Sequence, residues 1–255
     1  MKHEERIQKE FGRQAVAMSE SPVFNNRQAL DRLVHACELS RRMRVLDVGC
    51  GPGIVSAELA RQAGQVIGID ITPEMLDQAR RRCAEAQLSN VEFLAGPADR
   101  LPFEDRSFDV VVSRLTLHHV AQPSMVLREM ARVAKPDGRV VLSDIVCSEQ
   151  VAEADLQNAL EVLRDPSHVR MLAGSVLRSL VQAQALTIQS EQTWDIPREA
   201  QEWLAIAADP QRAGALLTLL RTLAEAEVKA GMGLCRDGQT VRFFHRHVLM
   251  VLKPL

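Results

Sequence analysis

The stretch 44–70 constrains the fold of this 255-residue chain more than any other. An apolar run ends at Asp47, three glycines follow at alternate positions, and a helix-forming segment leads to a second apolar run that ends at Asp70. Because glycine lets the backbone turn sharply and lets a ligand lie against it, this order predicts a βαβ unit with a ligand site at the turn.

The spacing of the glycines indicates the kind of ligand. A dinucleotide site has the pattern G-x-G-x-x-G, whose backbone N–H groups hold a pyrophosphate. The glycines here are Gly49, Gly51 and Gly53. Ile54 stands where the dinucleotide pattern needs its third glycine. Asp47 would repel a phosphate but suits a ligand with an ammonium and a sulfonium group, and Asp70 is placed to accept hydrogen bonds from both hydroxyls of a ribose.

At these residues the chain resembles the class I S-adenosylmethionine-dependent methyltransferases, whose first motif reads apolar-Asp-x-Gly-x-Gly-x-Gly. The likeness continues through residues 96–103, 107–112 and 132–139, which look like later motifs of the ubiquinone/menaquinone methyltransferase-like branch (methyltransferase type 11). That branch includes many small-molecule methyltransferases. The motifs together cover about residues 40–147 and imply S-adenosyl-L-methionine as the cofactor.

The resemblance also implies which residues contact the cofactor. Ile71 would pack on the adenine, and the backbone of Ala98 would reach its edge. Pro97 stands where relatives place Asp or Asn, so Asp99 is the candidate substitute. Arg114 would contact either the methionine carboxylate or the substrate. The full predicted set is Asp47, Gly49, Gly51, Gly53, Asp70, Ile71, Ala98, Asp99 and Arg114.

Helix and strand patterns alternate from residue 28 to about residue 146, which predicts a doubly wound parallel sheet with ligands at the carboxyl ends of its strands. After Cys147 a first helical pair precedes a predicted strand at 186–196, and a second pair leads to a last strand at 241–252. The relatives pair their last two strands antiparallel at the sheet edge. The predicted fold class is therefore α/β: a Rossmann-like seven-stranded sheet, mostly parallel with an antiparallel last strand, plus a helical cap.

Three segments are expected within one structural domain. Residues 1–40 form an N-terminal helical arm, either a lid or a packed arm; residues 41–147 form the cofactor-binding core; and residues 148–255 form the cap segments and the last strands. Relatives often carry a Tyr and a His in this arm, over the cofactor. This chain has no Tyr, and its nearest candidates are Met18 and Phe24.

Adjacent histidines follow the fourth predicted strand, at the functional edge of the sheet. A histidine general base that removes the proton of a hydroxyl nucleophile is chemically sensible, so His119 and His118 are the catalytic candidates. The alternative is that His118 is a packed, hydrogen-bonded residue near the cofactor. Adjacent histidines on a loop diverge and do not form a metal pair by themselves, so we expect no metal site.

A proline-broken stretch holds a polar cluster that would suit the wall of a substrate pocket: Arg164, Asp165, His168 and Arg170. An internal salt-bridge cluster that joins two helices is the alternative interpretation. Asp144, at the end of the fifth predicted strand, faces the same edge and is a candidate for orienting the substrate. The run 243–247, Phe-Phe-His-Arg-His, alternates along a predicted edge strand and is interpreted as structural.

Composition narrows the function classes. A formal net charge of −2 gives no general attraction for nucleic acid. The five cysteines are scattered without a Cys-x-x-Cys pair, which argues against a disulfide framework or a zinc site and favours a reducing cytoplasm. No apolar run approaches the ~20 residues needed to span a bilayer, so we expect no membrane partner.

We therefore predict a cytoplasmic S-adenosylmethionine-dependent methyltransferase that methylates a small organic molecule by in-line displacement. One alternative is an RNA or protein methyltransferase, which would need a basic groove. The other is a non-catalytic S-adenosylmethionine-binding protein, which a blocked pocket beside the sulfonium would distinguish, because a fold alone does not establish chemistry.

Overall fold

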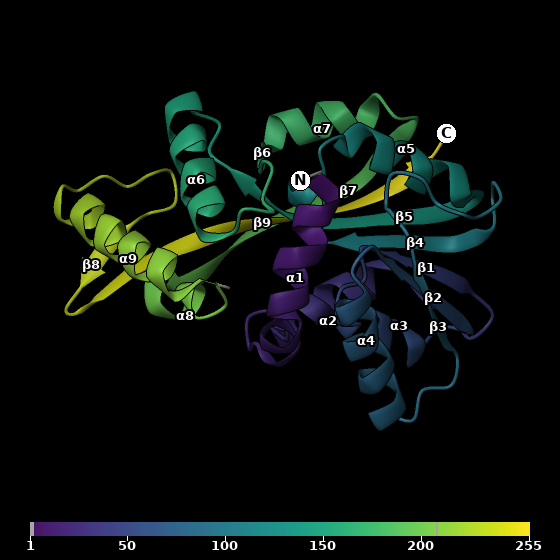
Figure 1. Cartoon of the computed structure of the whole chain (residues 1–255). Helices are drawn as coiled ribbons and strands as arrows, with labels where there is room; N and C mark the ends of the chain where they lie inside the picture. Colours follow the sequence, from purple (N-terminus) through teal and green to yellow (C-terminus); the bar gives the residue numbers. More distant parts are fainter. Residues whose placement is uncertain (1–2, 208) are drawn as a thin grey trace.

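The computed structural model describes residues 3–207 and 209–255 and contains a single continuous sheet flanked by helices (Figure 1). The described strands run in the order β3-β2-β1-β4-β5-β9-β7. Their bounds are β1 (Arg44–Val48), β2 (Gln65–Asp70), β3 (Val91–Ala95), β4 (Phe108–Arg114), β5 (Ala134–Cys147), β7 (Leu186–Glu199) and β9 (Thr240–Pro254). Two short strands lie off this path, β6 (Leu172–Ala173) beside β5 and β8 (Cys235–Asp237) beside β9.

The strand directions confirm the predicted Rossmann-like sheet. Strands β3, β2, β1, β4 and β5 are parallel, whereas β9 runs antiparallel to both β5 and β7. The last two long strands therefore pair as expected. One expectation is wrong in part: β7 is the outer strand, and within the run 243–247 Arg246 and His247 are paired with both β5 and β7, so β9 is not the edge strand that we expected.

Helices cover both faces of the sheet. Their bounds are α1 (His3–Glu20), α2 (Arg27–Ala36), α3 (Ile54–Ala60), α4 (Pro73–Glu85), α5 (Pro123–Val133), α6 (Val151–Arg164), α7 (Gly174–Gln182), α8 (Ala200–Leu204) and α9 (Pro210–Glu225), with a 3₁₀ turn, η1 (Leu117–His119). Helices α2 and α3 pack on one face and α5 and α7 on the other. None of the helices in the described residues is long and apolar enough to cross a membrane.

The side chains of β1 alternate between the two hydrophobic cores that lie on opposite faces of the sheet. Leu46 and Val48 are buried in the core shared with α5 and α7, whereas Val45 is buried in the core shared with α2 and α3. Successive side chains of a strand point to opposite faces, so Asp47 points to the same face as Val45. That orientation places the carboxylate of Asp47 under the first turn of α3.

The start of α4 is stabilised by the acid that ends β2. Thr72 is the N-cap residue and Pro73 takes the first helical position. The side chain of Thr72 makes no capping hydrogen bond. Instead, the carboxylate of Asp70 accepts the backbone N–H of Thr72 at 2.9 Å, so the acid at the end of β2 stabilises the entry into α4.

The C-terminal part builds a cap from α6, α8, α9 and β8. The cap has a hydrophobic core of its own, which includes Trp203, Leu216, Leu220 and Phe243. Strands β7 and β9 are 14 and 15 residues long, compared with 5 residues for β1. In Figure 1 these two strands extend well beyond the parallel strands, and the cap is built on the extension.

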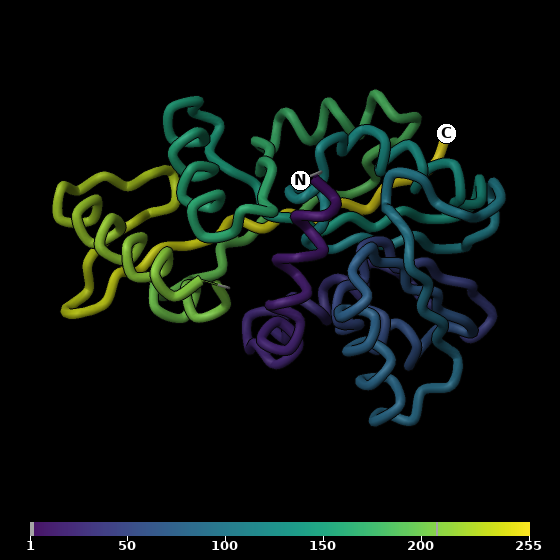
Figure 2. The backbone as a smooth tube through the Cα atoms, viewed as in Figure 1, coloured from purple at the N-terminus to yellow at the C-terminus, as the bar shows by residue number. Residues whose placement is uncertain are grey.

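Helix α1 lies between the parallel core and the cap, as the purple segment of the tube in Figure 2 shows. Its contacts with the core are made chiefly with α4. At its start, the ring nitrogen Nε2 of His3 lies 2.8 Å from the backbone oxygen of His119. The helix therefore crosses the carboxyl ends of the parallel strands, where a ligand site is expected.

Candidate functional site

The three glycines of the β1–α3 turn all have positive φ, of 68°, 51° and 74° in chain order, which is the region that glycine tolerates best. A Cβ at Gly49 would lie 2.5 Å from the side chain of Thr116, and a Cβ at Gly53 would lie 2.7 Å from that of Ala79. A Cβ at Gly51 would meet no heavy atom within 4 Å. Gly49 and Gly53 are therefore needed for packing, whereas Gly51 borders open space.

Two buried acids flank this turn. Asp47 accepts a hydrogen bond from the hydroxyl of Ser56 at 2.6 Å, and Asp70 accepts one from the backbone N–H of Gly51 at 2.8 Å. Burial raises the pKa of Asp47 to about 7, an effect that the hydrogen bond from Ser56 opposes and the nearby Asp70 reinforces. Burial also raises the pKa of Asp70. Such carboxyl groups favour a ligand that brings positive charge or hydroxyl donors.

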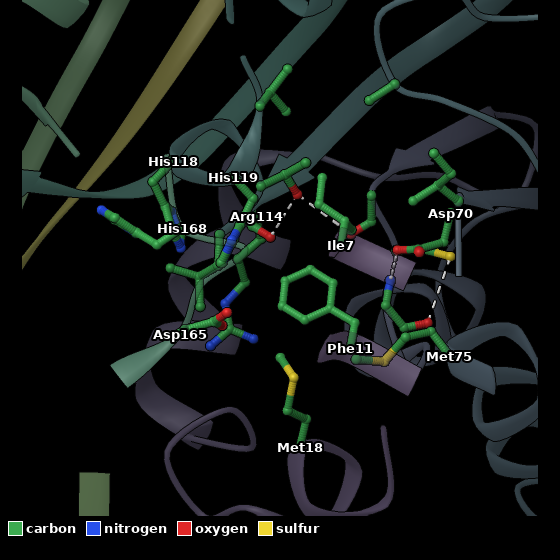
Figure 3. Close-up of a pocket in the computed structure, with 18 of the residues that line it drawn as sticks. Ile7, Phe11, Met18, Asp70, Met75, Arg114, His118, His119, Asp165 and His168 are labelled. Atoms are coloured by element: carbon green, nitrogen blue, oxygen red, sulfur yellow. Dashed lines mark hydrogen bonds between the residues drawn. The ribbon is translucent and has the colours of Figure 1, made fainter. Parts of the chain in front are cut away.

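A cavity of about 320 Å³ opens beside the turn. Of the predicted cofactor residues, those that line it are Asp47, Gly49, Gly51, Asp70, Ile71, Ala98, Asp99 and Arg114. Gly53 does not line the cavity, because it faces Ala79. The same cavity continues to both histidines of η1, and Figure 3 shows Asp70 at one end and His118 and His119 at the other.

Arg114 is a partly buried cation in the wall of the cavity. Its guanidinium donates a hydrogen bond to the backbone oxygen of Phe24 at 2.9 Å. Burial lowers the pKa of Arg114 to about 10, while the charge of Asp47 opposes this shift. The guanidinium has five N–H donors, so it can also hold an oxygen anion of a ligand.

Helix α1 supplies several cavity residues, of which Ile7 and Phe11 had no role assigned from the sequence. Ile7, Phe11 and Met18 point into the cavity in Figure 3, and the ring of Phe11 packs edge-on against His119, with 4.7 Å between the ring centroids. The loosely helical spacing of apolar residues in this segment was the available signal. Met18 and Phe24, the expected replacements for the arm residues of relatives, both line the cavity.

Gln14 of α1 adds an unsatisfied polar group to the same wall. Its side chain is 2% exposed, and its Nε2 has no hydrogen-bond partner among the described residues. A buried N–H without an acceptor is unfavourable, so such a group indicates a missing partner. A ligand that presents an oxygen at this point would satisfy it.

His118 is paired with Asp144. The Nδ1 atom of His118 lies 2.5 Å from the Oδ1 atom of Asp144, which also accepts the backbone N–H of Ile145, while Oδ2 accepts the backbone N–H of Leu117. Burial alone would lower the pKa of His118, but the charge and hydrogen bond of Asp144 raise it overall. Asp144 itself does not line the cavity, so the structure does not bring it to the wall where we expect the substrate. It holds the histidine instead.

His119 has a different environment. Its Nδ1 lies 3.3 Å from the hydroxyl oxygen of Ser167, which in turn donates to Asp165 at 2.6 Å. Burial, together with the nearby His118, lowers the pKa of His119 to about 3. His119 is therefore neutral at neutral pH and can accept a hydrogen bond on one ring nitrogen, whereas its neighbour is biased toward the charged form.

The polar stretch 164–170 packs directly on the histidine turn. The backbone N–H groups of Val169 and Arg170 both donate to the backbone oxygen of His118. Arg164, Asp165 and His168 line the cavity. Arg170 does not: it is half exposed and pairs with Asp155 at 2.9 Å, so the structure does not bring it together with the other three. The backbone bonds turn its side chain outward.

His168 completes the group of ring side chains. Its Nε2 lies 2.9 Å from the amide oxygen of Asn158, and its ring centroid lies 5.6 Å from that of His118. Burial, with the charge of His118, lowers the pKa of His168 to about 4. The described residues contain no group of three or more His, Cys, Asp or Glu side chains arranged to hold a metal ion.

The far wall of the cavity comes from the cap side and was not predicted. Glu161 pairs with His245 at 2.9 Å, and the guanidinium of Arg198 donates to the other ring nitrogen of His245 at 3.1 Å. His247 stacks on Trp194 with 5.7 Å between the ring centroids. Both histidines line the cavity, so the purely structural interpretation of residues 243–247 is incomplete. Their alternation along β9 places them on one face.

Comparison with known proteins agrees with this geometry. Residues 39–207 match the family model described as a methyltransferase domain. The uncharacterized methyltransferase YcgJ of Bacillus subtilis is 32% identical over 242 residues, 94% of this chain and 96% of that protein. Its crystal structure superposes with a TM-score of 0.82 at 30% identity, covering 89% of this chain and 98% of that one.

A second relative lies in the branch that the motifs resemble. Demethylmenaquinone methyltransferase of Bacillus cereus is 41% identical over 101 residues, which is 38% of this chain and 43% of that protein. The family match covers well over half of the chain, and the fold and the glycine turn agree with it. The chain belongs to the class I S-adenosylmethionine-dependent methyltransferases.

Proposed function

We propose that this methyltransferase acts on a small organic molecule held in the cavity between the glycine turn and the histidine turn η1. The main support for this proposal is that the cavity is continuous, since one space of about 320 Å³ borders both Gly51 and His119. Sites for small ligands typically have volumes of about 300–1,000 Å³ and place a few polar groups in a largely apolar wall.

The residues beside the turn suit S-adenosyl-L-methionine. The open space at Gly51 would let the cofactor lie against the turn. Asp70 would accept hydrogen bonds from the ribose hydroxyls, and Asp47 would face the ammonium group. Arg114 would hold the methionine carboxylate. Ile71, Ala98 and Asp99 would contact the adenine. When bound, the cofactor supplies an electrophilic methyl carbon, and the electron pair of the broken carbon–sulfur bond stays on sulfur.

The other end of the cavity would hold the acceptor. His119 lines this end and is neutral, so its ring can accept a hydrogen bond from the acceptor group, and by this position we assign it the role of proton acceptor during transfer. Arg164 and His168 would contact the substrate, whereas Asp144 and Arg170 are not assigned to it. Positioning alone can contribute about 7–11 kcal/mol to lowering the barrier, and α1 contributes by covering the site.

Two further features support a small molecule in a reducing compartment. The net charge of −2 gives no general attraction for nucleic acid. The five cysteines are free thiols, and all but Cys235 are buried. Unpaired cysteines are typical of the cytoplasm, so we propose that the protein works there.

The test is transfer of labelled methyl from S-adenosyl-L-methionine into a host-cell extract that is then separated into small-molecule, RNA and protein fractions. We expect label in the small-molecule fraction. An Asp70→Ala variant, which should not hold the cofactor, controls for other methyltransferases in the preparation. Label in RNA or protein would overturn the proposed substrate class. No label in any fraction, with cofactor binding intact, would favour a binding protein without transfer activity.

A further inference from the structure

His118 and His119 are neighbours in the chain and their rings pack 4.2 Å apart, yet they are bound to different partners. Both line the cavity at the end away from Asp70 (Figure 3). Each ring has one nitrogen bound to the protein. The partner of that nitrogen decides what the other nitrogen can do for a ligand.

The partner of His118 is a carboxylate. A carboxylate accepts but does not donate, so the Nδ1 of His118 carries a proton in its short bond to Asp144. Asp144 receives two backbone N–H groups as well, and these keep it ionised. A fixed negative charge next to the ring favours the doubly protonated form. The Nε2 of His118 is then a hydrogen-bond donor.

The partner of His119 is a hydroxyl with only one proton to give. Ser167 directs that proton to Asp165, whose oxygen also accepts the backbone N–H of Ser167 at 2.8 Å. The hydroxyl oxygen is therefore an acceptor toward His119, and the Nδ1 of His119 carries the proton. In a neutral imidazole the other nitrogen, Nε2, then holds the lone pair and accepts.

We infer that the two histidines form a paired recognition site for a substrate that presents an O–H or N–H next to a second oxygen. His119 accepts from the O–H or N–H that becomes methylated, and His118 donates to the neighbouring oxygen. Asp144 is the positioning residue that keeps His118 a hydrogen-bond donor. Ser167 and Asp165 are the positioning residues that keep His119 an acceptor. The inference rests on the proposed function, since it assumes a small substrate in this cavity.

The proton balance follows from these roles. The acceptor atom gains the methyl carbon and loses one proton, which passes to the Nε2 of His119. The electron pair of the broken bond stays on the sulfonium sulfur, and the proton leaves to water after the product. The transient charge on His119 is held by Ser167 and Asp165. The other ionisable groups that face the pair are Asp144, Glu161 and His168.

The first experiment reads the ring protons directly. The full-length protein with ¹⁵N-labelled histidine is studied by NMR near neutral pH, without substrate. We expect an Nδ1–H tautomer for His119 and protons on both nitrogens of His118. Ser167→Ala should turn His119 into a mixture of tautomers, whereas Ser179→Ala, an exposed serine on α7, should change nothing. An Nε2–H tautomer of His119 in the unaltered protein would overturn the inference.

The second experiment uses the labelled-methyl assay. Ser167→Ala should lower the transfer rate by up to about 100-fold, with the dissociation constant for S-adenosyl-L-methionine unchanged. Mass spectrometry of the labelled product should place the methyl on O or N beside an oxygen, and a methyl on sulfur or carbon would overturn the substrate class. If the NMR result holds but label enters RNA or protein, the proposed function fails while the division between the histidines stands.

Discussion

The backbone N–H of Gly51 donates to the carboxylate of Asp70 over 2.8 Å, so the glycine turn and the end of β2 form one unit. Asp70→Asn keeps the size of this side chain and removes its charge. Hydrogen bonds to charged groups contribute about 1.5–3 kcal/mol, so the dissociation constant for S-adenosyl-L-methionine should rise roughly 10- to 150-fold. Calorimetric titration measures this, with Asp77→Asn on the exposed surface of α4 as the control.

Gly51 and Gly53 should respond differently to an added methyl group. Both have positive φ, which costs another residue roughly 1–2 kcal/mol. A Cβ at Gly51 has free space, whereas at Gly53 it would lie 2.8 Å from the backbone of Ala79. We expect Gly51→Ala to fold but to bind the cofactor poorly, and Gly53→Ala to lose more stability. Thermal unfolding and titration separate the two effects; normal binding by Gly51→Ala would contradict the proposed cofactor position.

Asp47 should make cofactor binding depend on pH. Its pKa is raised to about 7, chiefly by burial. A bound ammonium group favours the carboxylate and lowers that pKa, so binding releases a proton and the affinity increases from about pH 6 to about pH 8. Calorimetry in two buffers of different ionisation heat measures the proton. The Asp47→Asn variant should not release this proton when the cofactor binds. Equal proton release by the variant and the parent protein would contradict the prediction.

The pair of His118 and Asp144 should stabilise the fold within a pH window. Burial opposes both charges, but each partner favours the other, so the pKa of His118 is raised and that of Asp144 is lowered. The His118 contribution is complete below its ordinary value of 6.5 and is lost as the pH rises through the raised pKa. The Asp144 contribution is complete above 3.8 and is lost as the pH falls through the lowered pKa.

Between these limits Asp144→Asn should reduce the free energy of unfolding by about 3 kcal/mol, because it leaves a buried cation without its partner. Urea unfolding at about pH 5 and about pH 9 gives the comparison. Asp155→Asn, which removes an exposed ion pair with Arg170, is the matched control and should have little effect. If Asp144→Asn reduced the free energy of unfolding no more at the lower pH than at the higher pH, the assigned charge pair of His118 and Asp144 would be contradicted.

Gln14 should show opposite effects with and without ligand. Its buried Nε2 has no partner among the described residues, and such a group costs about 1–3 kcal/mol. Gln14→Leu should therefore raise the melting temperature of the free protein, and the added stabilisation by S-adenosyl-L-methionine should shrink. Thermal unfolding with and without the cofactor tests both parts, with the exposed Gln62→Leu as the control. A free variant that melts below the parent protein would refute this account.

Sequence patterns predicted those parts of the fold whose residues lie close together in the chain. The strand β1, the glycine turn and the acid that ends β2 lie within 27 residues, and sequence spacing alone fixes their arrangement. Such segments are specified by burial and backbone conformation, which are readable one element at a time. The antiparallel last strand is different: the resemblance supplied it, because β9 pairs with the distant β5, Leu252 opposite Val140.

The roles of Asp144 and Arg170 depended on contacts between distant segments. Asp144 is 26 positions from His118, and its oxygens are taken by that ring and two backbone N–H groups. Arg170 is turned outward because its own backbone N–H binds the oxygen of His118. His245 reaches the cavity only because β9 is inserted between β5 and β7. None of these relations leaves a periodic signal in the sequence.

The length of β7 and β9 has a consequence for how such an enzyme can diversify. The cavity takes Arg198 and His245 from the base of the strand extension, but no described residue between 200 and 237 lines it. Helix α8 still supports the wall, because Glu202 binds Arg198 and Trp203 contacts Arg164 and His245. The exposed faces of α9 and β8 can therefore accumulate substitutions, or carry a fused domain or a fluorescent label, while the reacting groups stay in place. Sequence drift on this outer surface is thus physically separated from the chemistry.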